Sequence, residues 1–174
     1  MSKKWEKAAT GGEPSNACRT TILRIAPVLT ASGGVLGKLL LPFKFGLGGK
    51  VGSGDQFFPY ISALDFSRVV VDHVILGGGE NAEEKDRHRI YNLIAPEDAT
   101  NLQFTEALGT ALSRPTVVPL PSFAARLLFG EMAEEVLLGG TRCAPSRLLN
   151  EGFKFSHDNI ASAIKSAVDD NSAN

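Results

Sequence analysis

A short apolar segment at residues 20–26 constrains the fold of this chain more than any other feature. Its residues, Thr-Thr-Ile-Leu-Arg-Ile-Ala, are mostly β-branched or apolar, as in a strand that is buried on both faces. Pro27 lacks the N–H group that a central strand donates, so the strand must end before it. Strands buried on both faces occur in parallel sheets that helices cover, and the segment therefore predicts an α/β fold.

Helical and strand patterns alternate along the rest of the chain, which favours βα units and a mostly parallel sheet. Apolar residues at helical spacing predict a helix over residues 35–45, which Pro42 should kink or end. Asn101 is expected to cap the helix that follows it. Further helices are predicted over residues 3–9, 66–76, 101–112, 122–129, 131–138, 146–150 and 159–168, and strands over 89–94 and 117–118. Residues 46–54 predict a glycine-rich loop, 77–88 a solvated insertion and 169–174 a frayed end.

The composition is that of an ordinary globular protein and indicates no special partner. The chain has 174 residues and a net charge of −1, which argues against nucleic acid or an anionic membrane as the main partner. No apolar run reaches the roughly 18 residues that would span a bilayer. Cys18 and Cys143 are isolated and are expected to be reduced thiols. We therefore expect a soluble protein of an intracellular compartment, in the cytoplasm or an organelle.

Several kinds of chemistry are excluded by spacing. The glycine-rich loop has Val51 where a P-loop requires Ser or Thr after its lysine. Neither Tyr60 nor Tyr91 has a lysine four residues later, so neither forms the Tyr-x-x-x-Lys pair of a proton-transfer helix. The three histidines do not cluster at metal spacing. His157 has a serine and an aspartate beside it, but adjacent side chains point apart, which favours a capping or surface role.

An ordered set of motifs over residues 19–168 resembles the distal half of an NAD-dependent epimerase, in the atypical short-chain dehydrogenase/reductase family. The motifs are Leu23-Arg24-Ile25-Ala26-Pro27, Leu41-Pro42-Phe43-Lys44-Phe45-Gly46, Gly52-Ser53-Gly54-Asp55-Gln56, Phe58-Pro59-Tyr60-Ile61, Tyr91-Asn92-Leu93-Ile94-Ala95-Pro96, Pro119-Leu120-Pro121-Ser122 and Pro145-Ser146-Arg147-Leu148-Leu149. The last blocks are similar to the family's small C-terminal domain of unknown function. The glycine-rich dinucleotide fingerprint of such enzymes has no counterpart in this sequence.

The resemblance implies a fold, a cofactor and site residues. The expected fold is the C-terminal part of a Rossmann-type domain over residues 1–115, a small mostly helical domain over 116–168 and a disordered tail over 169–174. NADP(H) is implied for the full-length family, and none is expected to bind this chain alone. The residues implied near the cofactor are Ile25, Ala26 and Pro27, and those implied near the substrate are Phe43, Gly52, Ser53, Gly54, Gln56 and Phe58. No catalytic residue and no metal ligand is assigned.

Two departures from the family pattern bear on the substrate. Phe58 stands where sugar-nucleotide enzymes use an arginine to hold a diphosphate, and a phenyl ring cannot make that bidentate contact. Ser62 and Leu64 replace the usual histidine and first aspartate, while Asp65 keeps the second. A nucleotide sugar is therefore not expected as the ligand. The alternative for Phe58 and Tyr60 is packing in the core.

Three functional hypotheses follow from the resemblance. The first is a truncated NAD(P)-dependent epimerase-family oxidoreductase that is inactive alone, because the chain has neither the cofactor fingerprint nor the catalytic pair. The second is a non-catalytic binding or regulatory module that acts through an exposed sheet edge at residues 20–26, with a plastid-division-like role by family analogy. In the third, a separate chain docks at that edge and supplies the N-terminal half.

Overall fold

The computed structural model describes residues 2–10, 20–77, 88–118, 140 and 142–172. Within these ranges the core of the fold is a pair of parallel strands, β1 (Thr20–Ile25) and β4 (His88–Leu93). Their register runs from Thr20 opposite His88 to Ile25 opposite Leu93. A second parallel pair joins β2 (Val28–Leu29) to β3 (Ile61–Ser62). The α/β fold with parallel strands is thus confirmed.

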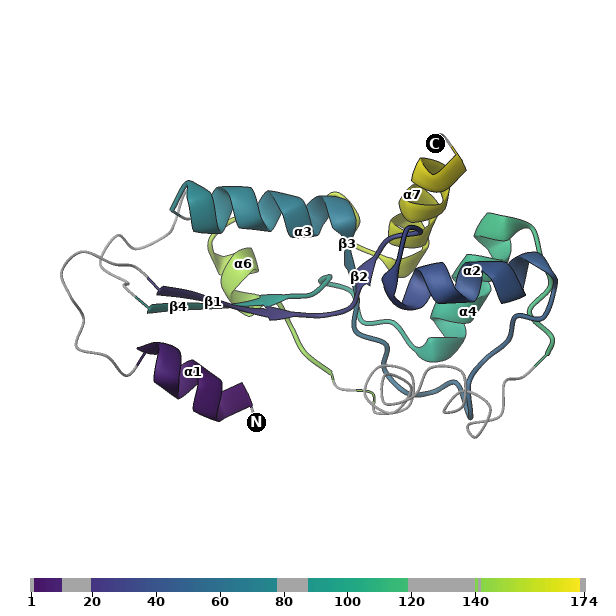
Figure 1. The fold of residues 1–174 in the computed structure, drawn as a ribbon, viewed down its shortest axis with the longest axis horizontal. Coiled ribbons are helices and arrows are strands. Elements are labelled where there is room, and N and C mark those ends of the chain that lie inside the picture. The colour runs from purple at the N-terminus through teal and green to yellow at the C-terminus, as the bar shows by residue number, and fades with distance from the viewer. Residues whose placement is uncertain (1, 11–19, 78–87, 119–139, 141, 173–174) are drawn as a thin grey trace.

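Helices lie on both faces of the β1–β4 pair (Figure 1). On one face lie α3 (Ala63–Val69), its continuation as the π-helix η1 (Val70–Ile75), and the short α6 (Ser146–Asn150). On the other face lies α1 (Ser2–Thr10). The remaining helices gather at one end of the molecule, beyond β2 and β3. They are α2 (Gly34–Lys44), α4 (Asn101–Leu112) and α7 (Ile160–Ser172).

Two apolar clusters divide this architecture. The larger packs α2, α4 and α7 around the buried rings of Phe58, Tyr60 and Phe104. The smaller lies between the β1–β4 pair and the helices α3 and α6, and contains Tyr91 and Phe153. Both clusters are built from residues far apart in sequence, so the C-terminal helices are integral to the described fold rather than an appendage.

Several predicted elements differ from the structure, each for a local reason. The helix expected over 66–76 begins at Ala63, because the Ser62 hydroxyl accepts the backbone N–H of Asp65 as an N-cap, and it changes to a π-helix at Val70. Pro42 lies inside α2, and the helix ends after the following turn. The last helix reaches Ser172, so the frayed end predicted from residue 169 was wrong.

The N-cap of α4 is also corrected. Thr100, not Asn101, caps it: the Thr100 hydroxyl accepts the Gln103 N–H at 3.2 Å, and the Gln103 side chain accepts the Thr100 N–H at 2.8 Å. Residues 117–118 form no strand, although the Val118 N–H reaches the Gly48 carbonyl at 3.4 Å. The helices predicted over 122–129 and 131–138 lie outside the described residues, as does most of the 77–88 insertion.

Candidate functional site

A large hollow bordered by described residues is an apolar groove between α1 and the β1–β4 pair. Its volume is about 710 Å³, within the range of ligand pockets, and it opens at the carboxyl end of β1. We call it the apolar groove. Its walls include Trp5 from α1, Ile25 and Pro27 from the end of β1, Pro59 and Ile94 beyond it, and Cys143. Ligands of parallel α/β sheets bind at this end of the strands, so the apolar groove is the candidate site.

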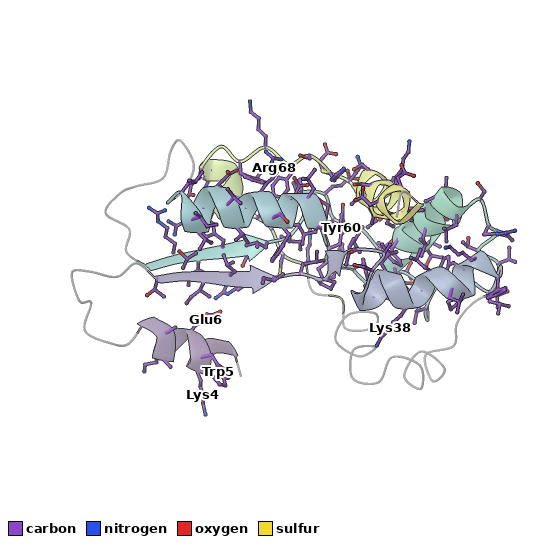
Figure 2. The ribbon with its side chains drawn as sticks, turned by 45° about the horizontal axis from the view of Figure 1, so that its top comes forward. Lys4, Trp5, Glu6, Lys38, Tyr60 and Arg68 are labelled. Atoms are coloured by element: carbon purple, nitrogen blue, oxygen red, sulfur yellow. The ribbon has the colours of Figure 1, made fainter. Side chains whose placement is uncertain are left out.

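A single ion pair closes one side of the apolar groove. The guanidinium of Arg24 on β1 donates from Nε and Nη2 to the two carboxylate oxygens of Glu6 on α1, each at 2.8 Å. The pairing with Glu6 raises the pKa of Arg24. Figure 2 shows Glu6 on the side of α1 that faces the strands. The pair fixes α1 against β1 and neutralises the positive charge of Arg24, the single cationic residue among the described residues that line the groove.

The three residues implied near the cofactor lie together on this wall. Ile25 is 52% exposed, and Ala26 and Pro27 are partly exposed beside it. The Ala26 N–H donates to the Leu93 carbonyl at 3.0 Å, which holds the segment at the end of β4. Ile25, Ala26 and Pro27 therefore form one continuous apolar edge of the groove. Their role toward a cofactor stays a prediction.

The glycine-rich residues implied near the substrate form a tight turn. Gly52 and Gly54 have φ values of 61° and 86°, which side chains rarely adopt. The Ser53 hydroxyl accepts the Asp55 N–H at 3.3 Å, and the Gln56 amide donates to the Val51 carbonyl at 2.8 Å. The Gly54 and Gln56 carbonyls accept the backbone N–H groups of Leu102 and Asn101, each at 2.9 Å, so the turn is joined to the start of α4. The four residues implied near the substrate in this turn do not line the apolar groove. They are Gly52, Ser53, Gly54 and Gln56.

Phe43 and Phe58, the other two residues implied near the substrate, lie in the larger apolar cluster. Phe43 is 3% exposed and Phe58 is 1% exposed. The Phe58 ring packs on Phe104 with centroids 4.4 Å apart. In this structure Phe58 occupies a core position, as the packing alternative expects, and a substrate contact for either ring stays a prediction.

A buried carboxylate ties α3 to the segment before α7. Asp65 is fully buried and accepts the Ser62 hydroxyl at 2.9 Å and the backbone N–H groups of Ser156 and His157 at 2.8 and 2.9 Å. Arg68, labelled in Figure 2, donates to the same carboxylate at 3.2 Å. The His157 Nδ1 lies 3.2 Å from the Ser62 hydroxyl. Ser62 is buried and gives its proton to Asp65, so this serine, histidine and aspartate form a structural clamp rather than a nucleophilic triad.

A second polar cluster lies inside the smaller apolar cluster and was not predicted from the sequence. The Tyr91 hydroxyl donates to Glu151 Oε2 at 2.8 Å, and the Arg147 Nε donates to Glu151 Oε1 at 2.8 Å. His73 of η1 packs edge-on against Tyr91 with its Nε2 3.5 Å from Glu151 Oε2. Burial lowers the pKa of His73, and burial with the hydrogen bond to Glu151 raises the pKa of Tyr91. Tyr91 lies 60 residues from Glu151 in sequence and His73 lies still further away, so the fold brings both to this carboxylate.

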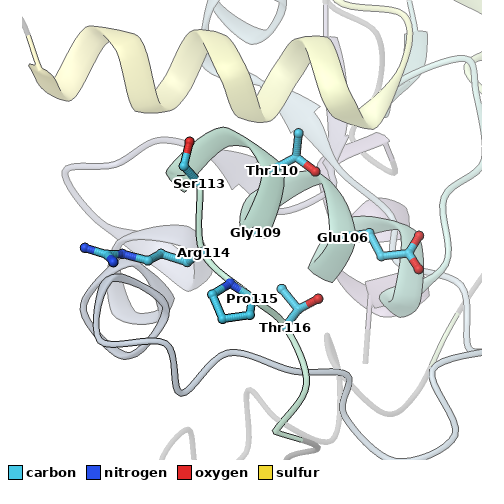
Figure 3. A pocket seen from close by; sticks show the side chains of 7 residues that line it. All are labelled: Glu106, Gly109, Thr110, Ser113, Arg114, Pro115 and Thr116. Carbon is cyan, nitrogen blue, oxygen red and sulfur yellow. The ribbon is translucent and has the colours of Figure 1, made fainter.

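Another hollow, of about 320 Å³, lies at the end of α4 (Figure 3). It is lined by Glu106, Gly109, Thr110, Ser113, Arg114, Pro115 and Thr116. Ser113 caps the helix in the left-handed conformation with φ 53°, and Arg114 N–H returns to the Gly109 carbonyl at 2.9 Å. The hollow is therefore the inside of a helix-ending turn, and it lies apart from the strand ends where ligands of this fold bind.

Two further kinds of site, a metal cluster and a membrane-spanning helix, are absent from the described residues. Across them, no group of three or more His, Cys, Asp or Glu side chains is placed to hold a metal ion. Over the same ranges, none of the helices has the length and apolar character needed to cross a membrane.

Parallel strands between helices, with an apolar groove at their carboxyl ends, are the arrangement of an α/β fold that binds ligands at that end of its strands. Comparison with known proteins agrees with this class. The profile of a domain of unknown function, DUF1731, matches residues 120–167. Epimerase family protein SDR39U1 of Homo sapiens is 38% identical over 165 residues, 95% of this chain and 53% of that protein. Epimerase family protein MT2273 of Mycobacterium tuberculosis is 38% identical over 160 residues, 92% of this chain and 50% of that protein.

Solved structures give the same result. The crystal structure of human SDR39U1 (isoform 2) with NADPH has a TM-score of 0.81 at 35% identity, and covers 97% of this chain and 54% of that one. A nucleoside-diphosphate sugar epimerase from Corynebacterium glutamicum shares the fold, with a TM-score of 0.63 at 24% identity over 95% of this chain and 29% of that one. Over nearly its whole length the chain is similar to epimerase family proteins, and it spans about half the length of the curated relatives it matches.

Proposed function

We propose that this chain provides the substrate side of an NADP(H)-dependent epimerase-family oxidoreductase and does not turn over a substrate by itself. The observation that carries the proposal is the exposed apolar edge of Ile25, Ala26 and Pro27 on the groove wall at the carboxyl end of β1. A nicotinamide ring needs such a flat apolar surface on one side. The relative whose fold is most similar among those described above was solved with NADPH.

The residues present fit one wall of a nicotinamide pocket but do not provide a cradle for the pyrophosphate. Arg24 is paired with Glu6, and this carboxylate neutralises the guanidinium charge that would attract a phosphate. The sequence also has no G-x-G-x-x-G turn before a helix, the element whose backbone N–H groups hold the pyrophosphate in such folds. NADPH, when bound, would supply a hydride to a carbonyl carbon. The groove residues would orient the ring and exclude water.

Complementation tests this proposal. The purified chain is titrated with NADPH, first alone and then with a separately expressed nucleotide-binding half of human SDR39U1, and NADPH fluorescence reports binding. We expect no saturable binding to either half alone and saturable binding to the mixture. Submicromolar binding of NADPH to this chain alone would contradict the proposal. Failure of the mixture, with the two halves shown to associate by gel filtration, would also count against it.

A second candidate function is a non-catalytic module that acts through the edge of β1. Among the described strands, β1 pairs only with β4, so no described strand lies along its other edge. Arg24 and Ile25, the last two residues of β1, are exposed. A two-stranded parallel sheet is rarely stable alone, and an added strand would satisfy the open backbone groups. The mass of the native protein in its own cells separates the candidates. A mass of 18.5 kDa favours the module, and a mass near twice that value favours one continuous oxidoreductase.

A further inference from the structure

The apolar groove indicates the chemical class of the ligand that enters it. Most of its lining side chains are aliphatic, aromatic or proline, and it has a volume of about 710 Å³. Trp5 forms one side and is 73% exposed, and Ile25 forms the opposite lip and is 52% exposed. Large exposed side chains facing one hollow stabilise an apolar ligand by removing its surface and their own from water.

The charge of the groove argues against an anionic ligand. Arg24 is the one lysine or arginine among its described lining residues, and its Nε and Nη2 each donate to Glu6 at 2.8 Å. The Glu6 carboxylate beside it offsets the attraction of the guanidinium for a diphosphate, because the carboxylate repels a second anion. A nucleotide sugar therefore meets no unpaired cation along the described walls.

The position that would hold a diphosphate in sugar-nucleotide enzymes, by resemblance, is Phe58. Its ring is 1% exposed and packs on Phe104, so this position presents no charged group that could hold a diphosphate. Arg142, which stacks over the ring of the neighbouring Phe57, pairs with Asp98 at 2.6 Å. Neither Arg24 in the groove nor the position of Phe58 therefore offers an unpaired cation to a phosphate group.

The polar groups that remain on the groove wall are neutral. Asn92 donates one amide hydrogen to the Ala144 carbonyl at 3.1 Å and carries a second, and Cys143 adds an exposed thiol. A neutral donor beside apolar walls suits a carbonyl oxygen, which accepts a hydrogen bond and carries no charge.

We propose that the apolar groove binds an uncharged carbonyl compound with an apolar, largely flat body and rejects nucleotide sugars. The assignment of a carbonyl rests on the proposed oxidoreductase function. In that reaction the carbonyl carbon would gain the hydride of NADPH and the oxygen would gain a proton from water, so the ligand would leave as the alcohol and NADPH would become NADP⁺. The binding preference itself rests on the groove and requires no cofactor.

Fluorescence of Trp5, the single tryptophan of the chain, reports entry of a ligand into the groove. The probe is 9,10-phenanthrenequinone, an uncharged flat dicarbonyl, and the competing class is represented by UDP-glucose. The full chain is titrated with each. We expect saturable quenching by the quinone and none by UDP-glucose at the same concentrations. Quenching by UDP-glucose with equal or higher affinity, or no saturable quenching by the quinone, would overturn the proposal.

Two variants test whether the change in Trp5 fluorescence comes from a ligand in the groove. Ile25→Glu places a carboxylate on its lip and should weaken quinone binding by about tenfold or more, because the charge must be desolvated. Ile75→Glu, at a 70% exposed position of η1 outside the groove, is the matched control and should change affinity by less than about twofold. Equal affinity in these two variants would overturn the proposal.

Glu6→Gln tests the charge argument in the opposite direction. It releases Arg24, so UDP-glucose should now quench Trp5 while quinone binding changes little. This variant also keeps the proposal testable if Ile25→Glu does not fold. Continued rejection of UDP-glucose by a folded Glu6→Gln chain would show that pairing of Arg24 does not set the preference. Because no measurement here uses NADPH, failure of the complementation experiment and failure of this proposal are separate results.

Discussion

The carboxylate of Asp65, in the first turn of α3, accepts the backbone N–H of Ser156 at 2.8 Å, across 91 residues of sequence. The same side chain accepts the His157 N–H at 2.9 Å and the Ser62 hydroxyl at 2.9 Å. A fully buried carboxylate with several hydrogen-bond donors is stabilising only while all of them are present. Asp65 therefore holds the segment that leads into α7 against the start of α3.

Asp65→Asn should destabilise the fold by about 2–4 kcal/mol, because an amide replaces one acceptor oxygen with a donor that faces N–H and O–H groups. Urea unfolding followed by circular dichroism measures the change. Asp55→Asn makes the same substitution at an exposed position and should stay within about 0.5 kcal/mol of the wild type. Equal midpoints for the two variants would refute a clamping role for Asp65.

Stability should fall in acid because of His73. Its imidazole is 2% exposed, burial lowers its pKa below the ordinary 6.5, and the nearby Glu151 only partly opposes this. The unfolded chain therefore binds a proton more readily than the folded chain. The contribution of His73 to the free energy of unfolding is fully present above pH 6.5 and decreases as the pH falls below it.

The contribution of His73 is isolated by the difference between the wild type and His73→Phe. Phenylalanine keeps the edge-on contacts with Tyr91 and Phe153 and cannot be protonated. The variant should gain stability relative to the wild type between pH 7.5 and pH 5, measured by thermal unfolding. A difference between the two proteins that does not change with pH would show that His73 does not titrate on unfolding.

The parallel fold could be predicted from the sequence, but the pairing of its two shortest strands could not. Residues 20–26 carry enough β-branched and apolar side chains to indicate a buried strand, and β1 lies there. The helix at 146–150 was predicted correctly as well. β2 and β3 are two residues each, too short for any periodic signal. Their pairing depends on the long-range packing around them.

At the candidate site, too, a local segment could be predicted from the sequence, but contacts between distant residues could not. The resemblance placed Ile25, Ala26 and Pro27 on one segment, and the structure shows that segment on the groove wall. The ion pair between Glu6 and Arg24 joins residues 18 apart, and no local pattern marks such a pair. Asn101 was expected to cap α4 because of its residue type, but its side chain instead accepts the Val51 N–H at 2.8 Å, which leaves the cap to Thr100.

Gly109 should not tolerate alanine, although alanine usually stabilises a helix by about 1 kcal/mol over glycine. A Cβ at this position in α4 would collide with the Thr116 methyl group and lie 2.9 Å from the Arg114 carbonyl oxygen (Figure 3). Overpacking of this kind costs about 1–3 kcal/mol, so the net effect should be destabilising. Urea unfolding of Gly109→Ala and of Gly109→Ala with Thr116→Ala measures it. The double variant should recover part of the loss, and a stabilised single variant would contradict the expected collision.

The two buried tyrosines should respond differently to removal of the hydroxyl. Tyr60 is 1% exposed, and its hydroxyl has no hydrogen-bond partner among the described groups, whereas the hydroxyl of the fully buried Tyr91 donates to Glu151 at 2.8 Å. Burial and the carboxylates of Glu97, Asp158 and Asp98 raise the pKa of Tyr60, so it stays neutral. Tyr60→Phe removes a polar atom that contributes no protein hydrogen bond and should change stability by less than about 1 kcal/mol, in either direction.

Tyr91→Phe is the matched substitution, and it leaves the buried Glu151 carboxylate short of one donor at a cost of about 1.5–3 kcal/mol. Both phenylalanine variants keep ring packing, so their difference in the free energy of unfolding, measured in urea at pH 7, isolates the hydrogen bond. A loss in Tyr60→Phe equal to that in Tyr91→Phe would mean that the Tyr60 hydroxyl is hydrogen-bonded as strongly as that of Tyr91.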